Sequence, residues 1–315
     1  ATVLDAMLAP PPYTTKYETE ILAEEQREGY RAKKLCFNLT GYSRVNAYVL
    51  IPDGEGPFPA VVLLHDHGGH YTIGKEKMIR PFGVDKAVLD DADAWAANCY
   101  GGQYAGDYLA AHGYVVISVD ALYWGERGRK EGADGSKYAD NAGNFMMLGR
   151  SLSAFMNYED MYTTDYLATL PEVDPKRIAC MGFSMGGYRA WMLSALSDKI
   201  QVGAAICWMT TTDCQFSWEY GRERGGFANM LPGIRRYLDY PHIASIACPK
   251  PMLFLNGEHD KLFPPIGVRA AFAEMHEVWE SRSAGDKLVT ELWDMPHDCG
   301  KKVQAKILDF LNKWL

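Results

Sequence analysis

The sequence predicts an α/β fold with a mainly parallel, doubly wound sheet and helices on both of its faces. Its strand-like segments are continuous apolar runs, which is typical of strands covered on both faces. They alternate with helix-length stretches in which apolar residues recur every three or four positions. The chain has 315 residues and is 48% hydrophobic, so it can bury a large core. Alternation of this kind favours one large layered sheet.

Seven segments are predicted to be strands. They are 45–52, 60–66, 114–124, 177–183, 202–208, 251–257 and 288–294. Three stretches between or after them have helical periodicity, namely 152–166, 188–195 and 303–314. The first 44 residues are expected to form an N-terminal arm and an edge strand. Residues 45–315 are therefore predicted to form a single domain, with the arm 1–44 in front of it.

Two insertions interrupt the alternation, at about 68–100 and 209–247. Each is long, contains glycine, charged and aromatic residues, and leaves the carboxyl end of a predicted strand. Long connections are more often functional than idle. In open α/β sheets that edge is where ligands bind. The two insertions are thus expected to contribute to a binding site.

Composition excludes several classes of partner. The formal net charge of −8 leaves no basic stripe for a nucleic acid backbone. No apolar run reaches the roughly 20 residues that a membrane helix needs, so a soluble protein without membrane contact is expected. The seven cysteines are scattered, without a C-x-x-C pair, and suggest neither a zinc site nor a disulfide framework. The chain begins at Ala1, which leaves a periplasmic or secreted location after signal-peptide removal open.

A G-x-S-x-G sequence, Gly182 to Gly186, follows the predicted strand 177–183 and opens a predicted helix. Small residues on both sides of Ser184 suit a tight strand-to-helix turn that holds the hydroxyl clear of the sheet, at the positive end of the helix. Ser184 is therefore the candidate nucleophile. The alternative is a glycine-rich turn whose serine only caps the helix.

A serine nucleophile needs a histidine to take its proton and an acid to orient that histidine. Asp260 and His297 each follow a later predicted strand, in the order serine, acid, histidine. Glu258 is the rival acid, but the proline-containing loop after the strand favours Asp260. Other polar residues are expected to have lesser roles: His259 and His276 solvated, His242 able to line a pocket, and Asp120 structural.

The motifs GFSMGG, NGEHDKLFPP and MPHD, spread over residues 45–315, resemble those of α/β-hydrolases in the branch of dienelactone hydrolases and acetyl xylan esterases. The resemblance implies an α/β-hydrolase fold and a catalytic triad of Ser184, Asp260 and His297. Dienelactone hydrolases proper use a cysteine nucleophile, whereas this chain has Ser184. The departure favours hydrolysis of simple esters over that of lactones.

Three histidines, His65, His67 and His70, follow the strand 60–66. The resemblance implies that this His- and Gly-containing turn supplies a backbone N–H, from His67 or Gly68, to an oxyanion hole whose other donor is the N–H of Met185. The alternatives are a metal site and a structural turn. Metallohydrolases with a similar spacing place an aspartate before the third histidine, where this chain has Gly69, so no metal is expected.

The remaining candidates concern substrate. Trp208 and the insertion after it offer residues suited to a sugar ring and a carboxylate, namely Trp218, Tyr220, Arg222 and Arg224. A packed lid without ligand contacts is the alternative. Between 122 and 132, Arg127, Arg129 or Lys130 could meet an acidic substrate, but an internal ion pair of Glu126 with an arginine and a solvated basic tail is favoured.

The expected function is a serine esterase that removes small ester groups, acetyl or methyl, from carbohydrate substrates through an acyl-enzyme. No cofactor is expected, and the expected partner is a small-molecule or oligosaccharide ester, with the oligomeric state open. Four alternatives remain: an α/β-hydrolase peptidase, a general carboxylesterase, a metallohydrolase that uses His65, His67 and His70, and a non-catalytic binding protein.

Overall fold

The computed structural model describes residues 10–128, 134–216 and 226–315. It contains one nine-stranded sheet with the strand order β1-β2-β3-β5-β4-β6-β7-β8-β9. The strands are β1 (Glu20–Arg27), β2 (Tyr30–Thr40), β3 (Ser43–Pro52), β4 (Phe58–Leu64), β5 (Val115–Val119), β6 (Val173–Phe183), β7 (Ile200–Ile206), β8 (Met252–Gly257) and β9 (Leu288–Trp293). The six neighbouring strands β5, β4, β6, β7, β8 and β9 pair in parallel. The pairs β1–β2, β2–β3 and β3–β5 are antiparallel.

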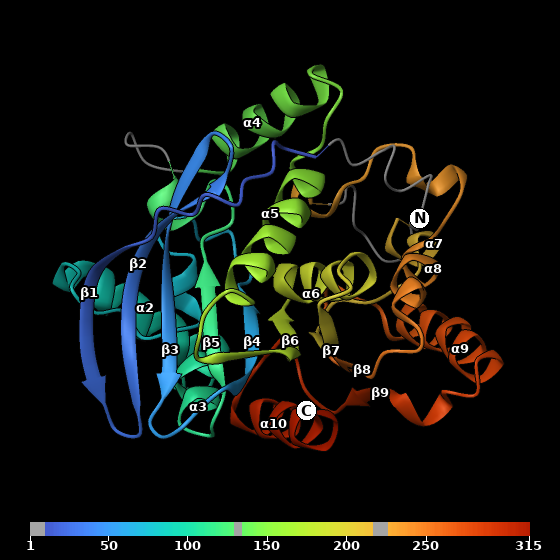
Figure 1. The fold of residues 1–315 in the computed structure, drawn as a ribbon. Coiled ribbons are helices and arrows are strands. Elements are labelled where there is room, and N and C mark those ends of the chain that lie inside the picture. The colour runs from blue at the N-terminus through green and yellow to red at the C-terminus, as the bar shows by residue number, and fades with distance from the viewer. Residues whose placement is uncertain (1–9, 129–133, 217–225) are drawn as a thin grey trace.

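Helices cover both faces of the sheet (Figure 1). The α-helices are α2 (Lys86–Cys99), α3 (Ala105–Ala110), α4 (Gly135–Met147), α5 (Leu152–Leu167), α6 (Met185–Leu196), α7 (Thr212–Gln215), α8 (Tyr240–Ala244), α9 (Pro265–Ser281) and α10 (Lys301–Trp314). Six short 3₁₀ helices in the described part are η1 (Lys75–Lys77), η2 (Gly125–Arg127), η4 (Phe227–Asn229), η5 (Ile234–Arg236), η6 (Ser245–Ala247) and η7 (Gly285–Lys287).

The central strands explain why two layers of helices are needed. In β4, Val61 and Leu63 pack in one cluster with residues of α3 and α10, whereas Val62 and Leu64 pack in another with residues of α5 and α6. Successive side chains of a strand point to opposite faces, so a strand that is apolar at every position must be covered on both. The predicted mainly parallel, doubly wound fold is confirmed.

The first 44 residues contribute more strand than expected. They form β1 and β2, and β2 extends the sheet by pairing with β3. The burial of β2 nearly alternates, so its apolar residues are spaced by two rather than contiguous. That pattern is typical of a strand covered on one side and is easily overlooked beside the continuous central runs. The boundary at residue 44 stays a prediction.

Both insertions contain helices, and each insertion follows the carboxyl end of a strand, β4 or β7. Residues 68–100 contain η1 and α2, and residues 209–247 contain α7, η4, η5, α8 and η6. In the described residues, no helix is long and apolar enough to cross a membrane.

Candidate active site

Ser184 occupies the tight turn between β6 and α6. Its backbone has φ 55° and ψ −122°, a region that L-residues rarely adopt. A Cβ on Gly182 would lie 2.2 Å from the backbone oxygen of Gly186, and a Cβ on Gly186 would lie 1.8 Å from that of Leu64. Only glycine fits at these two positions of the motif, because a side chain would collide with the neighbouring backbone. The turn places Ser184 at the amino end of α6, where backbone N–H groups and the helix dipole favour negative charge.

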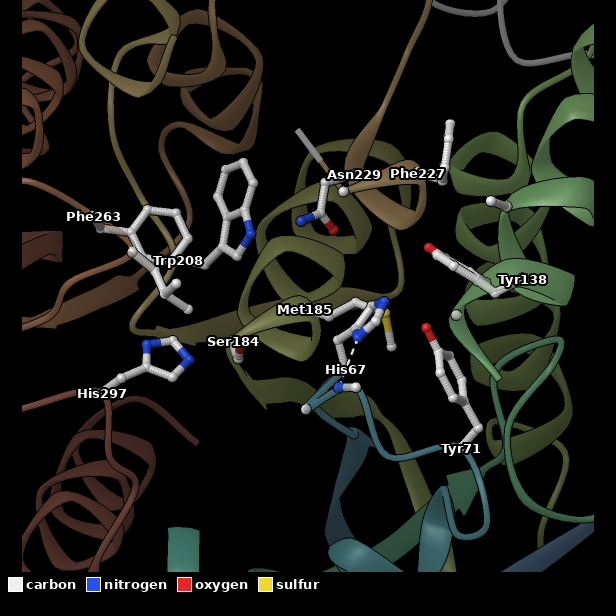
Figure 2. A pocket seen from close by; sticks show the side chains of 16 residues that line it. His67, Tyr71, Tyr138, Ser184, Met185, Trp208, Phe227, Asn229, Phe263 and His297 are labelled. Carbon is white, nitrogen blue, oxygen red and sulfur yellow. Dashed lines mark hydrogen bonds between the residues drawn. The ribbon is translucent and has the colours of Figure 1, made fainter. Parts of the chain in front are cut away.

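His297 and Asp260 form a short hydrogen bond. The distance from His297 Nδ1 to Asp260 Oδ2 is 2.6 Å, and the Asp260 side chain is fully buried. The other carboxylate oxygen of Asp260 accepts a hydrogen bond from the N–H of Leu262 at 2.8 Å. Phe183 packs against the imidazole, with ring centroids 4.7 Å apart. Figure 2 shows the second ring nitrogen of His297 facing Ser184. Ser184 and His297 line the same cavity, and His297 is bonded to Asp260, so the three residues predicted from the sequence lie in one region of the structure.

Glu258, the rival acid, points elsewhere. Its carboxylate pairs with Arg269 at the surface, and its side chain is 42% exposed. The neighbouring His259 is exposed and pairs with Asp294 at 2.6 Å. The geometry therefore supports Asp260 over Glu258 as the partner of His297.

The other two histidines of the C-terminal half are engaged in local contacts. His276 Nε2 lies 2.8 Å from Thr290 Oγ1. His242 caps α8 by accepting a hydrogen bond from the N–H of Asp239, and it pairs with Glu274 at 3.1 Å. His242 is absent from the residues that line the cavity around Ser184.

Two of the three histidines after β4, His65 and His70, make separate sets of contacts. His65 is fully buried; its Nδ1 lies 2.9 Å from the Asp66 carbonyl oxygen, and its Nε2 accepts from the N–H of Ala121 at 2.9 Å. Burial lowers the pKa of His65 well below its ordinary value. His70 pairs with Asp91 and stacks on Trp95. These two imidazoles have structural roles.

Metal-type ligands come together at two places in the described part of the chain, and neither includes these histidines. One group is Cys207, Asp260 and His297. Burial raises the pKa of the Cys207 thiol, which disfavours the thiolate that would bind a metal. The other is Glu76, Asp120 and Glu126. Lys75 Nζ lies 2.7 to 2.8 Å from each carboxylate of the second group, so a protein ammonium already occupies the position that a cation would take.

The turn after β4 is built for a close backbone approach. Gly68 and Gly69 have φ values of 61° and 65°, in the left-handed region that favours glycine. A Cβ on Gly68 would lie 2.3 Å from the ring of Trp95. His67, Gly68 and Met185 line the same cavity as Ser184. The turn and the start of α6 therefore border the same cavity as Ser184, and their role as oxyanion donors stays a prediction.

The cavity around Ser184 has a volume of about 450 Å³ (Figure 2). That size lies within the range of small-molecule sites. Trp208, predicted from the sequence, is one of its walls. Five other residues of the cavity wall were not predicted from the sequence, namely Tyr71, Tyr138, Phe227, Asn229 and Phe263. Of these, Tyr71 directly follows the histidine turn. Trp218, Tyr220, Arg222, Arg224, Arg129 and Lys130 lie outside the described residues.

The expected ion pair of Glu126 with an arginine does not form with Arg127, and Arg129 lies outside the described residues. Glu126 accepts hydrogen bonds from Lys34 and Lys75, both at 2.7 Å. Arg127 instead forms a bidentate ion pair with Glu159 of α5. The reason is that the 3₁₀ turn η2 directs these adjacent side chains to different neighbours, and Lys34 comes from the first 44 residues.

Buried ion pairs fix the elements that carry the site. Burial opposes the charge of Lys75, but Asp120 and its other carboxylate neighbours hold the Lys75 pKa well above its ordinary value. Asp120 accepts hydrogen bonds from the backbone N–H and from the side-chain ammonium of Lys75, which supports the structural role expected for it. Arg189 of α6 forms a bidentate pair with Asp160 of α5, at 2.6 and 2.9 Å. This pair joins the helix that begins after Ser184 to its neighbour.

Comparison with known proteins places the chain in a family. The model of the Abhydrolase family matches residues 1–283. The protein named Putative hydrolase YtaP, from Bacillus subtilis (strain 168), is 29% identical over 297 residues, which cover 94% of this chain and 92% of that protein.

Solved structures share the fold at low identity. A putative acetyl xylan esterase from Bacteroides fragilis NCTC 9343 has a TM-score of 0.73 and 19% identity, over 93% of this chain and 73% of that one. A glucuronoyl esterase from Solibacter usitatus has a TM-score of 0.67 and 15% identity, over 98% and 91% of the two chains. With the family model covering most of the sequence, the chain belongs to the Abhydrolase family and is an enzyme with the α/β-hydrolase fold.

Proposed function

We propose that the enzyme is a serine esterase that removes small ester groups, acetyl or methyl, from carbohydrate substrates. The observation that carries the proposal is the 2.6 Å hydrogen bond between His297 and buried Asp260, next to Ser184 at a strained turn that opens into the cavity. Structures of similar fold are named as acetyl xylan and glucuronoyl esterases, which supports an ester of a carbohydrate.

The proposed mechanism has two steps. Ser184 Oγ attacks the ester carbonyl carbon while His297 Nε2 takes the hydroxyl proton, and Asp260 stabilises the resulting imidazolium. The carbonyl oxygen becomes an oxyanion between the N–H of Met185 and that of His67 or Gly68. His297 then gives its proton to the leaving alcohol, and the bond from the carbonyl carbon to that oxygen breaks.

The second step hydrolyses the acyl-enzyme. A water molecule, deprotonated by His297, attacks the acyl carbon, and Ser184 leaves with the proton. Asp260 holds the imidazole in one orientation through both steps, because its carboxylate is fixed by the N–H of Leu262. Every proton transfer uses residues of this chain.

The test is a screen of ester substrates. Acetate and methanol released from acetylated xylan and methyl-esterified pectin would be measured beside hydrolysis of p-nitrophenyl esters of increasing chain length. We expect short acyl chains to be preferred and at least one of the two glycans to be cleaved. The Ser184→Ala variant should be inactive, and the wild type should remain active in the presence of a chelator. Best cleavage of long acyl chains, with both glycans untouched, would contradict the carbohydrate part of the proposal.

A further inference from the structure

A buried ammonium group lies behind the histidine turn that follows β4. It belongs to Lys77 of η1, in the first of the two insertions, and its side chain has no exposed surface. The ring of Trp95 covers it, with Nζ 4.9 Å from the ring centroid. Burial lowers the pKa of Lys77, and the nearby carboxylate of Asp66 counteracts this. A buried charge is costly, so the groups that it contacts indicate its role.

The contacts of this ammonium are confined to two consecutive residues. Lys77 Nζ lies 3.3 Å from Asp66 Oδ2 and donates to the backbone carbonyl oxygens of Asp66 and His67, both at 3.1 Å. An ammonium has three N–H donors, so these three acceptors use all of them. Lys77 therefore joins η1 to the backbone of the turn as well as to a carboxylate.

Both carbonyl groups have further donors that fix their direction. The Asp66 carbonyl oxygen lies 2.9 Å from Nδ1 of His65. The His67 carbonyl oxygen accepts hydrogen bonds from Trp124 Nε1 at 3.2 Å and from the N–H of His70 at 3.3 Å. With the ammonium included, each carbonyl oxygen has at least two partners. The two carbonyl groups are thus held on the side of the turn that faces the ammonium.

The direction of these carbonyl groups decides where the neighbouring N–H groups point. A peptide unit is planar and trans, so its C=O and N–H point in opposite directions. The Asp66 carbonyl shares a peptide unit with the His67 N–H, and the His67 carbonyl shares one with the Gly68 N–H. Both N–H groups therefore point away from Lys77. His67 and Gly68 line the cavity around Ser184, whereas Lys77 does not (Figure 2).

We infer that Lys77 is a positioning residue of the active site, because it holds the turn so that the N–H groups of His67 and Gly68 face the oxyanion. The inference rests on the proposed serine esterase function, in which one of these groups and the N–H of Met185 bind the oxyanion. Donors that are held before the reaction need no rearrangement when the negative charge develops. The ammonium also polarises the two carbonyl groups, which strengthens the N–H groups of the same peptide units as donors.

The kinetic test replaces Lys77 with methionine, which keeps an unbranched side chain and removes the three donors. Complete loss of one oxyanion donor costs about 10²- to 10³-fold in kcat, so donors that are only less well held should cost less. We expect Lys77→Met to lower kcat for p-nitrophenyl acetate about 10- to 100-fold. KM should stay within about threefold of the wild type, because the full oxyanion charge is present only after the attack.

Trifluoroacetophenone is an inhibitor that reports on the oxyanion itself. Ser184 Oγ adds to its carbonyl carbon, the hydroxyl proton passes to His297, and the carbonyl oxygen becomes an oxyanion that cannot go on to products. The inhibition constant should rise in Lys77→Met by about the factor by which kcat falls. A purely structural role would change the free energy of unfolding and leave both constants of the folded enzyme unchanged.

Lys250→Met is the matched control. Lys250 is partly buried and also donates to two backbone carbonyl oxygens, those of Ser194 and Ser197, at 2.8 and 2.7 Å. These carbonyl groups lie at the end of α6 remote from Ser184. The control should therefore keep kcat and the inhibition constant within about twofold of the wild type.

A second variant removes a side effect of the substitution. Lys77→Met leaves the buried Asp66 carboxylate without its cation, which is destabilising. Lys77→Met combined with Asp66→Asn removes both charges and should show a similar loss of kcat and of inhibitor affinity. If the single variant does not fold, the double variant provides the test. Failure of both to fold would assign Lys77 to the stability of the fold and overturn the inference.

The remaining outcomes separate the inference from the esterase proposal. A kcat and an inhibition constant within about twofold of the wild type in a folded Lys77 variant, or a change in KM alone, would overturn only the inference. If the wild type hydrolysed no ester, the esterase proposal would fail. Fluorine NMR would then measure the ketone adduct without turnover. An adduct that weakens in Lys77→Met would support the positioning role, and an adduct indifferent to Lys77, or no adduct, would refute it.

Discussion

Asp260→Asn should reduce turnover about 10⁴-fold, and the structure shows why. Asp260 Oδ1 accepts the N–H of Leu262, and Oδ2 faces His297 Nδ1. An asparagine has one oxygen, which the N–H of Leu262 would retain, so its NH₂ group would replace Oδ2. His297 Nδ1 would then have to accept a hydrogen bond, and the ring proton would move to Nε2, the nitrogen that faces Ser184. The imidazole could no longer act as a base.

A loss of this size corresponds to about 5.4 kcal/mol in the activation barrier. The assay is hydrolysis of p-nitrophenyl acetate, with circular dichroism to show that the variant is folded. Glu258→Gln is the control, because Glu258 pairs with Arg269 at the surface, and it should stay within about twofold of the wild type. If Asp260→Asn kept near wild-type turnover while Glu258→Gln lost it, the reasoning from the hydrogen bonds of Asp260 would be refuted.

Three further predictions concern stability. Gly68→Ala should lower the free energy of unfolding by about 1–3 kcal/mol, because its φ of 61° is strained for alanine and a tryptophan ring fills the space; thermal unfolding checks this. Asp160→Ala should cost about 3–5 kcal/mol in urea unfolding, because Arg189 would stay buried without its partner, and a neutral effect would contradict this account. Although burial acts in the opposite direction, Lys75 lowers the pKa of Glu126 from its ordinary 4.5 to about 2. The stability that Glu126 contributes is therefore present above about pH 4.5 and lost as the pH falls toward 2, so the Glu126→Gln protein should have a flatter stability curve in that window.

Local sequence pattern was sufficient to predict the central sheet and the residues around Ser184. The continuous apolar runs mark strands covered on both faces, and the glycines around Ser184 mark a turn in which a Cβ would collide with the backbone. Asp260 and His297 each follow a strand at the same edge of the sheet, so their order along the chain was informative. These signals are local because each depends on one strand and the turn that follows it.

The rest of the site depends on contacts between distant segments. Lys75 is fully buried, although its sequence context of charged residues is typical of a surface loop. It is charged inside the protein because Asp120 and Glu126 come to it from beyond β5. Tyr138 reaches the cavity from α4, with no sequence motif of its own. Such placements follow from tertiary packing and could not be obtained from periodicity.

The central claim is that Ser184 is the nucleophile, and covalent labelling tests it most directly. The wild-type protein would be treated with a serine-directed fluorophosphonate, digested and analysed by mass spectrometry. We predict one label per chain, on the peptide that contains Ser184, with activity lost in proportion to labelling and no label on folded Ser184→Ala. Labelling at another serine, or full esterase activity in folded Ser184→Ala, would contradict the account.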